Sequence, residues 1–136
     1  MRIVLDTNVF LVSLSPFSQY APIFDAFLTG RFTLLLSNEV ITEYEEVIAQ
    51  RYDRETVQDV LRLLVSIQNA GLITPHYRWK LIINDPDDDK FVDLAVAGNA
   101  DFIVTNDKHF KVLEQISFPL VKTISAEEFL KMLAAL

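Results

Sequence analysis

The chain has 136 residues, of which 51% are hydrophobic, 23% are charged and only three are glycine. This length and composition are typical of one compact domain, residues 1–136, with a well-filled core, and they exclude a disordered chain. The absence of cysteine excludes disulfide bonds and thiolate metal sites. No apolar stretch is long enough to cross a bilayer and the N-terminus lacks the pattern of a secretory signal, so we expect a soluble, cytoplasmic protein.

The net charge is −7, from 19 acidic and 12 basic residues. A protein that holds nucleic acid by general electrostatics is normally basic, so this charge argues against a simple nucleic-acid-binding module. The negative net charge is weaker evidence against a metal-dependent nuclease, because such an enzyme needs acidic residues around its cations. The acidic residues are indeed unevenly spread, because residues 84–89 read NDPDDD.

Secondary structure follows from hydrophobic spacing and from capping residues. Residues 3–5 form a short apolar run and residues 32–36 a largely apolar segment, both of which predict buried strands, and residues 6–8 (DTN) lead from the first strand into a helix. The remaining pattern predicts helices at 20–29, 37–51, 54–70, 87–97 and 108–115. It also predicts an edge strand at 72–74, a loop at 75–83 and further strands at 101–104 and 119–122. A capping box of Ser125 and Glu128 predicts a last helix at 129–136. This alternation predicts an α/β fold, a three-layer α/β/α sandwich with a central parallel sheet.

Four acidic residues are expected at one edge of that sheet. Asp6 follows the first strand, and Asp107 stands just after the strand at 101–104. Because right-handed crossovers place helix N-termini at the edge where strands end, Asp88 and Glu43, in the first and second turns of their helices, should lie there too. Asp88 has apolar neighbours three, four and seven residues later, which puts it on the inward face of its helix.

Clustered carboxylates repel one another and raise one another's pKa unless a cation compensates their charge. Such a site suits Mg²⁺ or Mn²⁺, and with two histidines and no cysteine a zinc site is disfavoured. Carboxylate-bound divalent metal is suited to hydrolysing phosphodiesters with an activated water. Asn8 and Thr105 would orient the carboxylates or simply close turns.

Structural alternatives exist for each of these residues. Asp6, Asp88 and Asp107 are all placed where an aspartate caps a helix, and Glu43 could be a surface acid. Their neighbours Asp85, Asp87 and Asp89 are expected to be solvated or capping residues, although Asp85 or Asp89 could hold a metal-bound water. His76 and His109 show no metal-ligand spacing.

Several ordered motifs carry a family resemblance. The segments LDTNVF, SNEVITEYEEVI and DPDDDKFVDLAVAGNADFIVTNDKHF together resemble the PIN-domain ribonucleases, and especially the VapC-like toxins of toxin–antitoxin pairs. The resemblance implies a parallel α/β/α sandwich, cleavage of RNA, an antitoxin partner that covers the acidic site, and in many members a homodimer. It implies metal ligands at Asp6, Glu43, Asp88 and Asp107, with Asn8 and Thr105 beside them.

An acidic site that binds RNA needs basic residues at its flanks. Lys90, Lys108, His109 and Lys111 lie near the predicted edge and are candidates for phosphate contacts, although they could equally be solvated surface residues. No sequence feature offers base readout.

Two other classes remain for comparison. A phosphatase of the haloacid dehalogenase type needs a second aspartate two residues after the first, where this chain has Asn8. A receiver-type phosphoacceptor also fails, because Asp53 opens a helix instead of ending a strand. The alternative that stays open is a catalytically silent PIN-like interaction module, which only a cleavage assay can separate from a nuclease.

Overall fold

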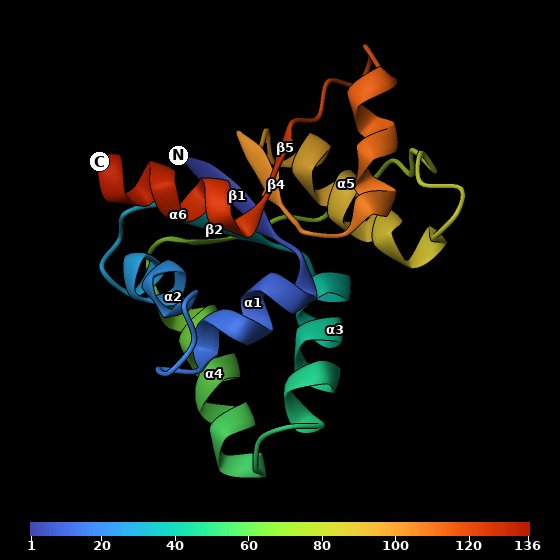
Figure 1. Cartoon of the computed structure of the whole chain (residues 1–136). Coiled ribbons are helices and arrows are strands. Elements are labelled where there is room, and N and C mark those ends of the chain that lie inside the picture. The colour runs from blue at the N-terminus through green and yellow to red at the C-terminus, as the bar shows by residue number, and fades with distance from the viewer.

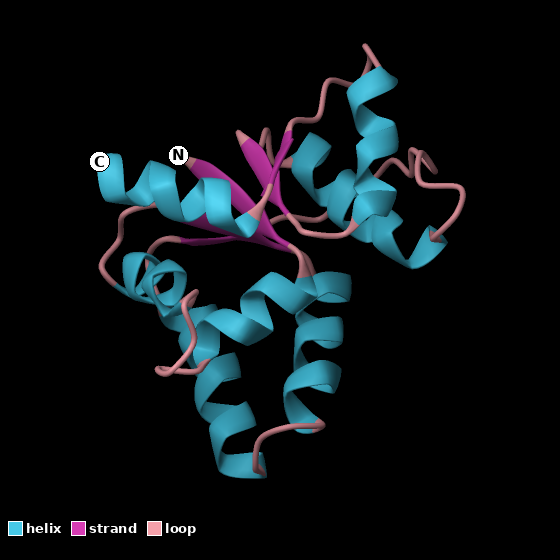
Figure 2. Cartoon of the chain, viewed as in Figure 1, coloured by secondary structure: helices cyan, strands magenta, loops and turns pink.

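The computed structural model describes residues 1–136 and contains one five-stranded sheet whose strands are all parallel (Figures 1 and 2). The strands are β1 (Arg2–Leu5), β2 (Thr33–Leu36), β3 (Ala70–Leu72), β4 (Phe102–Val104) and β5 (Thr123–Ile124). Their order across the sheet is β3-β2-β1-β4-β5, so β1 lies at the centre. The chain therefore adds β2 and β3 on one side of β1, then crosses the sheet and adds β4 and β5 on the other side.

Helices flank this sheet, as the alternating pattern predicts. They are α1 (Thr7–Leu14), α2 (Ala21–Leu28), α3 (Asn38–Ala49), α4 (Arg54–Ser66), α5 (Asp89–Ala97) and α6 (Ala126–Ala135), with the 3₁₀ helices η1 (Pro86–Asp88) and η2 (Lys108–Gln115). Because parallel crossovers are right-handed, the connections that run from β1 to β3 and those that return to β5 cover opposite faces. Figure 1 shows α1 to α4 gathered below the sheet, with α5 on the other side. The α/β sandwich is confirmed.

The central strands are buried on both faces. In β1, Ile3, Val4 and Leu5 are at most 1% exposed, which is why this strand reads as an unbroken apolar run. The α3 helix is fixed against the end of β1 by Tyr44, whose hydroxyl donates a hydrogen bond to the Leu5 carbonyl oxygen. The Tyr44 ring stacks on Phe10 of α1 with centroids 4.3 Å apart. These contacts hold the start of α1 and the second turn of α3 together at one sheet edge.

The predicted edge strand at 72–74 and the helix at 54–70 are wrong in their boundaries. The α4 helix ends at Ser66, and β3 pairs with β2 from Ala70. The Asn69 side chain explains the difference, because its amide donates hydrogen bonds to the carbonyl oxygens of Phe27 and Phe32. Those bonds hold residue 69 beside β2, where a continued helix could not reach.

The predicted strand at 119–122 is also wrong, because β5 consists of Thr123–Ile124. Pro119 has no backbone N–H to donate to a ladder, and pairing with β4 begins where the Ile103 N–H donates to the Lys122 carbonyl oxygen. The Ser125 and Glu128 capping box is present, and α6 begins directly after it, before the predicted residue 129. No helix combines the length and the apolar character that spanning a membrane requires.

Candidate metal centre

Asp6 lies at the carboxyl end of the central strand. Its backbone N–H donates to the Val104 carbonyl oxygen, which places it between β1 and β4. The residue is 6% exposed, and its Oδ2 accepts a hydrogen bond of 2.7 Å from the Thr105 hydroxyl. Although Asp6 occupies the N-cap position of α1, its side chain makes no capping bond. The capping interpretation is therefore wrong for this carboxylate, which faces the sheet edge instead.

Thr105 joins Asp6 to Asp107. The Thr105 hydroxyl donates to Asp6 and accepts a 3.0 Å hydrogen bond from the backbone N–H of Asp107. Asp107 also caps η2, because its Oδ1 accepts a 2.9 Å hydrogen bond from the His109 N–H. For Asp107 the capping interpretation is confirmed, although the cap uses only one of the two carboxylate oxygens.

Asp88 ends η1, immediately before α5, and is half-buried. It makes no capping bond, and its Oδ2 is shielded from solvent without a hydrogen-bond partner. Burial raises the pKa of Asp88 to about 8, helped by its contact with Asp107 and by the charges of Asp85 and Asp6. Burial also raises the pKa of Asp6. The hydrogen bond from Thr105 lowers this pKa, but the charges of Asp107 and Glu43 add to the rise, and the net shift is upward. These carboxylates thus lie close enough to oppose one another's ionisation.

The residues beside Asp88 point elsewhere. The Asp89 carboxylate accepts a 2.9 Å hydrogen bond from the Ile82 N–H, and Asp87 is exposed. His76 is also exposed, far along the loop from the acidic residues. Among the three consecutive aspartates, Asp88 is the one whose carboxylate joins the cluster, in agreement with its helical phase.

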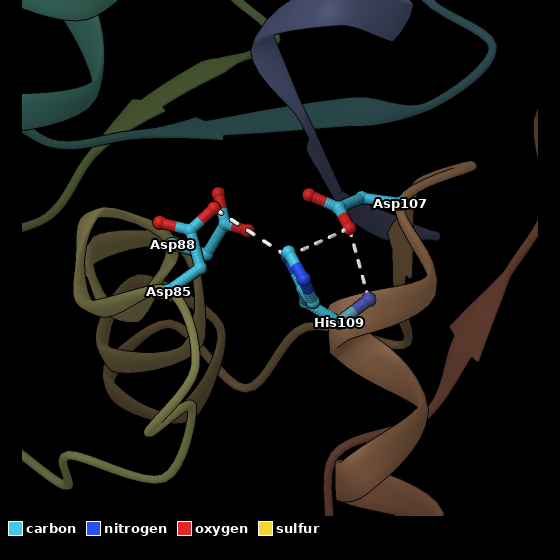
Figure 3. Close-up of side chains that lie close together, drawn as sticks. All are labelled: Asp85, Asp88, Asp107 and His109. Atoms are coloured by element: carbon cyan, nitrogen blue, oxygen red, sulfur yellow. Dashed lines mark hydrogen bonds and ion pairs between the residues drawn. The ribbon is translucent and has the colours of Figure 1, made fainter.

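Two residues that the sequence did not mark as ligands complete the cluster. Figure 3 shows Asp85 beside Asp88, with the His109 ring between this pair and Asp107. The His109 Nδ1 lies 3.3 Å from Asp107 Oδ1 and 3.5 Å from Asp85 Oδ2. One ligating atom from each of these four residues lies within 4.8 Å of the others. No periodicity could have revealed them, because Asp85 precedes η1 whereas His109 lies in η2, in a separate segment of the chain.

Glu43 reaches the same edge from α3, where two neighbours hold it. Its Oε1 forms a 2.7 Å ion pair with Lys90 Nζ, and the Thr7 hydroxyl donates to its Oε2. Burial alone would lower the pKa of Lys90, but the hydrogen bond and the charge of Glu43 outweigh it, and the pKa is raised. Lys90 therefore compensates the charge of Glu43, while phosphate contact by Lys90 remains a prediction.

Two cavities open beside the carboxylates. One, of about 310 Å³, is lined by Asp6, Asp107, the exposed Asn8 and four further residues. The other, of about 260 Å³, adjoins Asp107 and contains the exposed side chains of Lys108 and Lys111. The acidic cluster is thus open to a ligand on a side that carries two lysines.

Comparison with known proteins is consistent with this geometry. A family model described as the PIN domain matches residues 2–109. The chain belongs to the PIN-domain family. Comparison with curated protein sequences gave no significant match.

Solved structures with a similar fold include VapBC2 from Rickettsia felis bound to a DNA fragment from its promoter. That structure shares 20% sequence identity at a TM-score of 0.63, over 92% of this chain and 98% of that one. VapBC-1 from nontypeable Haemophilus influenzae shares 14% identity at a TM-score of 0.63, over 93% and 99% of the two chains. The T. brucei RRP44 PIN domain shares 13% identity at a TM-score of 0.54, over 98% and 80%. At these identities the likeness supports the fold.

Proposed function

We propose that this PIN-domain protein is a Mg²⁺- or Mn²⁺-dependent endoribonuclease that hydrolyses RNA phosphodiesters. The observation that carries the proposal is the convergence of Asp6, Asp88 and Asp107, from three separate segments, in one partly buried cluster where burial and mutual charge raise the pKa of Asp6 and of Asp88. Uncompensated carboxylates in such a place destabilise the fold, and a divalent cation removes that penalty. Glu43 on the flank is the fourth proposed ligand.

The donor set fits a hard cation. Asp88 Oδ2 is buried with no partner in the protein, and the other donors are mostly carboxylate oxygens. A cation bound there supplies activation of water and compensation of the charge that develops on the phosphate. The protein contributes fixed orientation, because the Thr105 hydroxyl holds Asp6 Oδ2 and the η2 turn holds Asp107 Oδ1. Asn8, at the rim of the adjoining cavity, is the proposed positioning residue on the substrate side.

RNA is the proposed substrate, and it must approach an acidic site in a chain of net charge −7. Lys108 and Lys111 are exposed beside Asp107, where their ammonium groups can contact the flanking phosphates. Contacts of this kind position a strand without reading its bases. We therefore propose that these two lysines set affinity and its salt dependence.

We further propose that the protein is the toxin of a toxin–antitoxin pair. The similarity in fold to VapBC2, to VapBC-1 and to FitAcB from Neisseria gonorrhoeae supports this role. An antitoxin would cover the acidic cluster, the toxin would act in the cytoplasm, and it would form a homodimer. The role predicts that production of the chain alone arrests growth, and that production of the Asp6→Asn variant does not.

The alternative, a catalytically silent interaction module, has one observation in its favour. The Lys90 ammonium already compensates the charge of Glu43, so one of the four proposed ligands is engaged within the protein. A module of this kind would fold and bind its partner without any cleavage of RNA.

Cleavage of a mixed RNA panel in Mg²⁺, Mn²⁺ or EDTA tests the proposed activity. The Asp6→Asn variant is compared with Asp25→Asn, a matched substitution at an exposed residue of α2. We expect cation-dependent cleavage by wild type and by Asp25→Asn, and its loss in Asp6→Asn and in EDTA. Folded wild-type protein that cleaves no RNA with either cation would favour the interaction module.

A further inference from the structure

His109 is placed toward the acidic cluster by a rigid turn. Its backbone N–H donates to Asp107 Oδ1, and the next residue, Phe110, is 1% exposed in the core. The start of η2 therefore holds the imidazole on the same side as the Asp107 carboxylate. Figure 3 shows the ring between Asp85 and Asp107.

The Nδ1 atom of that ring accepts or donates no well-formed hydrogen bond, and its two neighbours are carboxylate oxygens. It is shielded from solvent, and the oxygens of Asp107 and Asp85 lie 3.3 and 3.5 Å away. A neutral imidazole that turned its Nδ1 lone pair toward these oxygens would be repelled by them. A cation between the nitrogen and the oxygens would convert every one of these contacts into an attraction.

The size of the cluster suits a single cation. The ligating atoms of Asp85, Asp88, Asp107 and His109 all lie within 4.8 Å of one another. Opposite ligands of an octahedral cation with bonds of about 2.0–2.2 Å are about 4.0–4.4 Å apart. The limit of 4.8 Å exceeds this spacing by about 0.4–0.8 Å, so the most widely separated ligand atoms would need to close by at most that amount.

The donor set also has a preference among cations. Mg²⁺ takes oxygen ligands almost exclusively, whereas first-row transition cations accept imidazole nitrogen alongside carboxylates. An imidazole beside the carboxylates therefore suits Mn²⁺ better than Mg²⁺. We propose that His109, through Nδ1, is a direct ligand of the cation and makes this site selective for Mn²⁺ over Mg²⁺, with Asp85 as a ligand beside it.

This inference rests on the proposed metal-dependent function, but its test reads the metal instead of RNA. Mn²⁺ is titrated into the full chain and followed by electron paramagnetic resonance, with Mg²⁺ as competitor. The electron spin echo of bound Mn²⁺ then reports whether a ¹⁴N nucleus is coordinated. The variants are His109→Asn, which offers an amide oxygen near the position of Nδ1, and His76→Asn at the other, exposed histidine.

We expect a ¹⁴N signal in wild type and in His76→Asn, and its loss in His109→Asn. We also expect His109→Asn to bind Mn²⁺ about tenfold more weakly while its Mg²⁺ affinity changes much less, so that the preference for Mn²⁺ shrinks by about the same factor. Bound Mn²⁺ without a ¹⁴N signal in wild type, or no Mn²⁺ binding at all, would overturn the inference, and neither result depends on how a variant folds. A protein that shows the nitrogen ligand and cleaves no RNA would refute the nuclease and leave the His109 ligand intact.

Discussion

Replacing Asp88 with asparagine should stabilise the metal-free protein at alkaline pH. Asp88 is half-buried beside Asp107, and its pKa rises from the ordinary value of 3.8 to about 8. Between these two values the folded state binds a proton that the unfolded state has lost, so the free energy of unfolding falls as pH rises from about 4 to about 8. Above pH 8 the full penalty of the ionised carboxylate is present. An asparagine side chain stays neutral at every pH and therefore carries no such penalty.

The magnitude follows from the shift. Each pKa unit corresponds to about 1.4 kcal/mol, which sets an upper limit of about 6 kcal/mol. Solvent screens a half-buried group and Asp107 shares the titration, so we discount this limit to about 1–2 kcal/mol for Asp88→Asn. The gain should shrink to about a third of this value at pH 5 and vanish only below about pH 4, where Asp88 is protonated in both the folded and the unfolded state. Addition of Mn²⁺ at pH 8 should reverse the order, because the cation stabilises wild type more than the variant.

Urea unfolding in EDTA at pH 5 and pH 8 measures this difference. The matched control is Asp87→Asn, since Asp87 is the exposed neighbour in the same 3₁₀ turn. We expect the stability of Asp87→Asn to follow wild type at both pH values. Equal stability of Asp88→Asn and wild type at pH 8, or an equal gain in Asp87→Asn, would refute the claim that the cluster strains the fold.

Two further substitutions test how the sheet edge is built. Thr105→Val keeps the side-chain shape but leaves the part-buried Asp107 N–H without its hydrogen-bond acceptor and removes a buried hydrogen bond to Asp6, so urea unfolding at pH 7 should show a loss of about 2–3 kcal/mol. Thr105→Ser should stay close to wild type, and a valine variant equal to the serine variant would contradict this role of the hydroxyl. Gly98→Ala would place a Cβ 2.7 Å from Cδ1 of the fully buried Leu35, so thermal or urea unfolding should show a loss of about 1–3 kcal/mol, and an unchanged midpoint would mean that the core repacks freely.

The centre of the fold could be predicted from sequence because the central strands carry a strong local signal. The runs at 3–5 and 34–36 are apolar at every position and buried on both faces, which only a central parallel strand requires. The edge strands carry no such signal. The β5 strand has two residues, and the position of β3 depends on hydrogen bonds from Asn69 to the carbonyl oxygens of residues distant in sequence.

The positions of the acidic residues could be predicted to the extent that topology determines them. Asp6 and Asp107 follow strands that end at the same edge, and the inward phase of α5 selected Asp88 from three consecutive aspartates. The ion pair of Glu43 with Lys90 could not be predicted in the same way. It joins α3 to α5, and which lysine meets which glutamate depends on how those two helices pack.

Asp85 and His109 show why a spacing rule misses candidate ligands of this kind. A ligand motif is visible in sequence when one helix or one turn carries two ligands at a fixed separation. Here the loop before η1 is held by side chains of α5. Asp93 accepts a hydrogen bond from the Trp79 backbone N–H, and Asp89 accepts one from the Ile82 backbone N–H. Those bonds hold the segment that leads to Asp85 against α5, so Asp85 faces His109 only after α5 and η2 have both packed on the sheet. The donor that distinguishes the candidate site from an all-oxygen one is therefore a product of tertiary structure, and the chemistry of the site is decided by packing as much as by its aspartates.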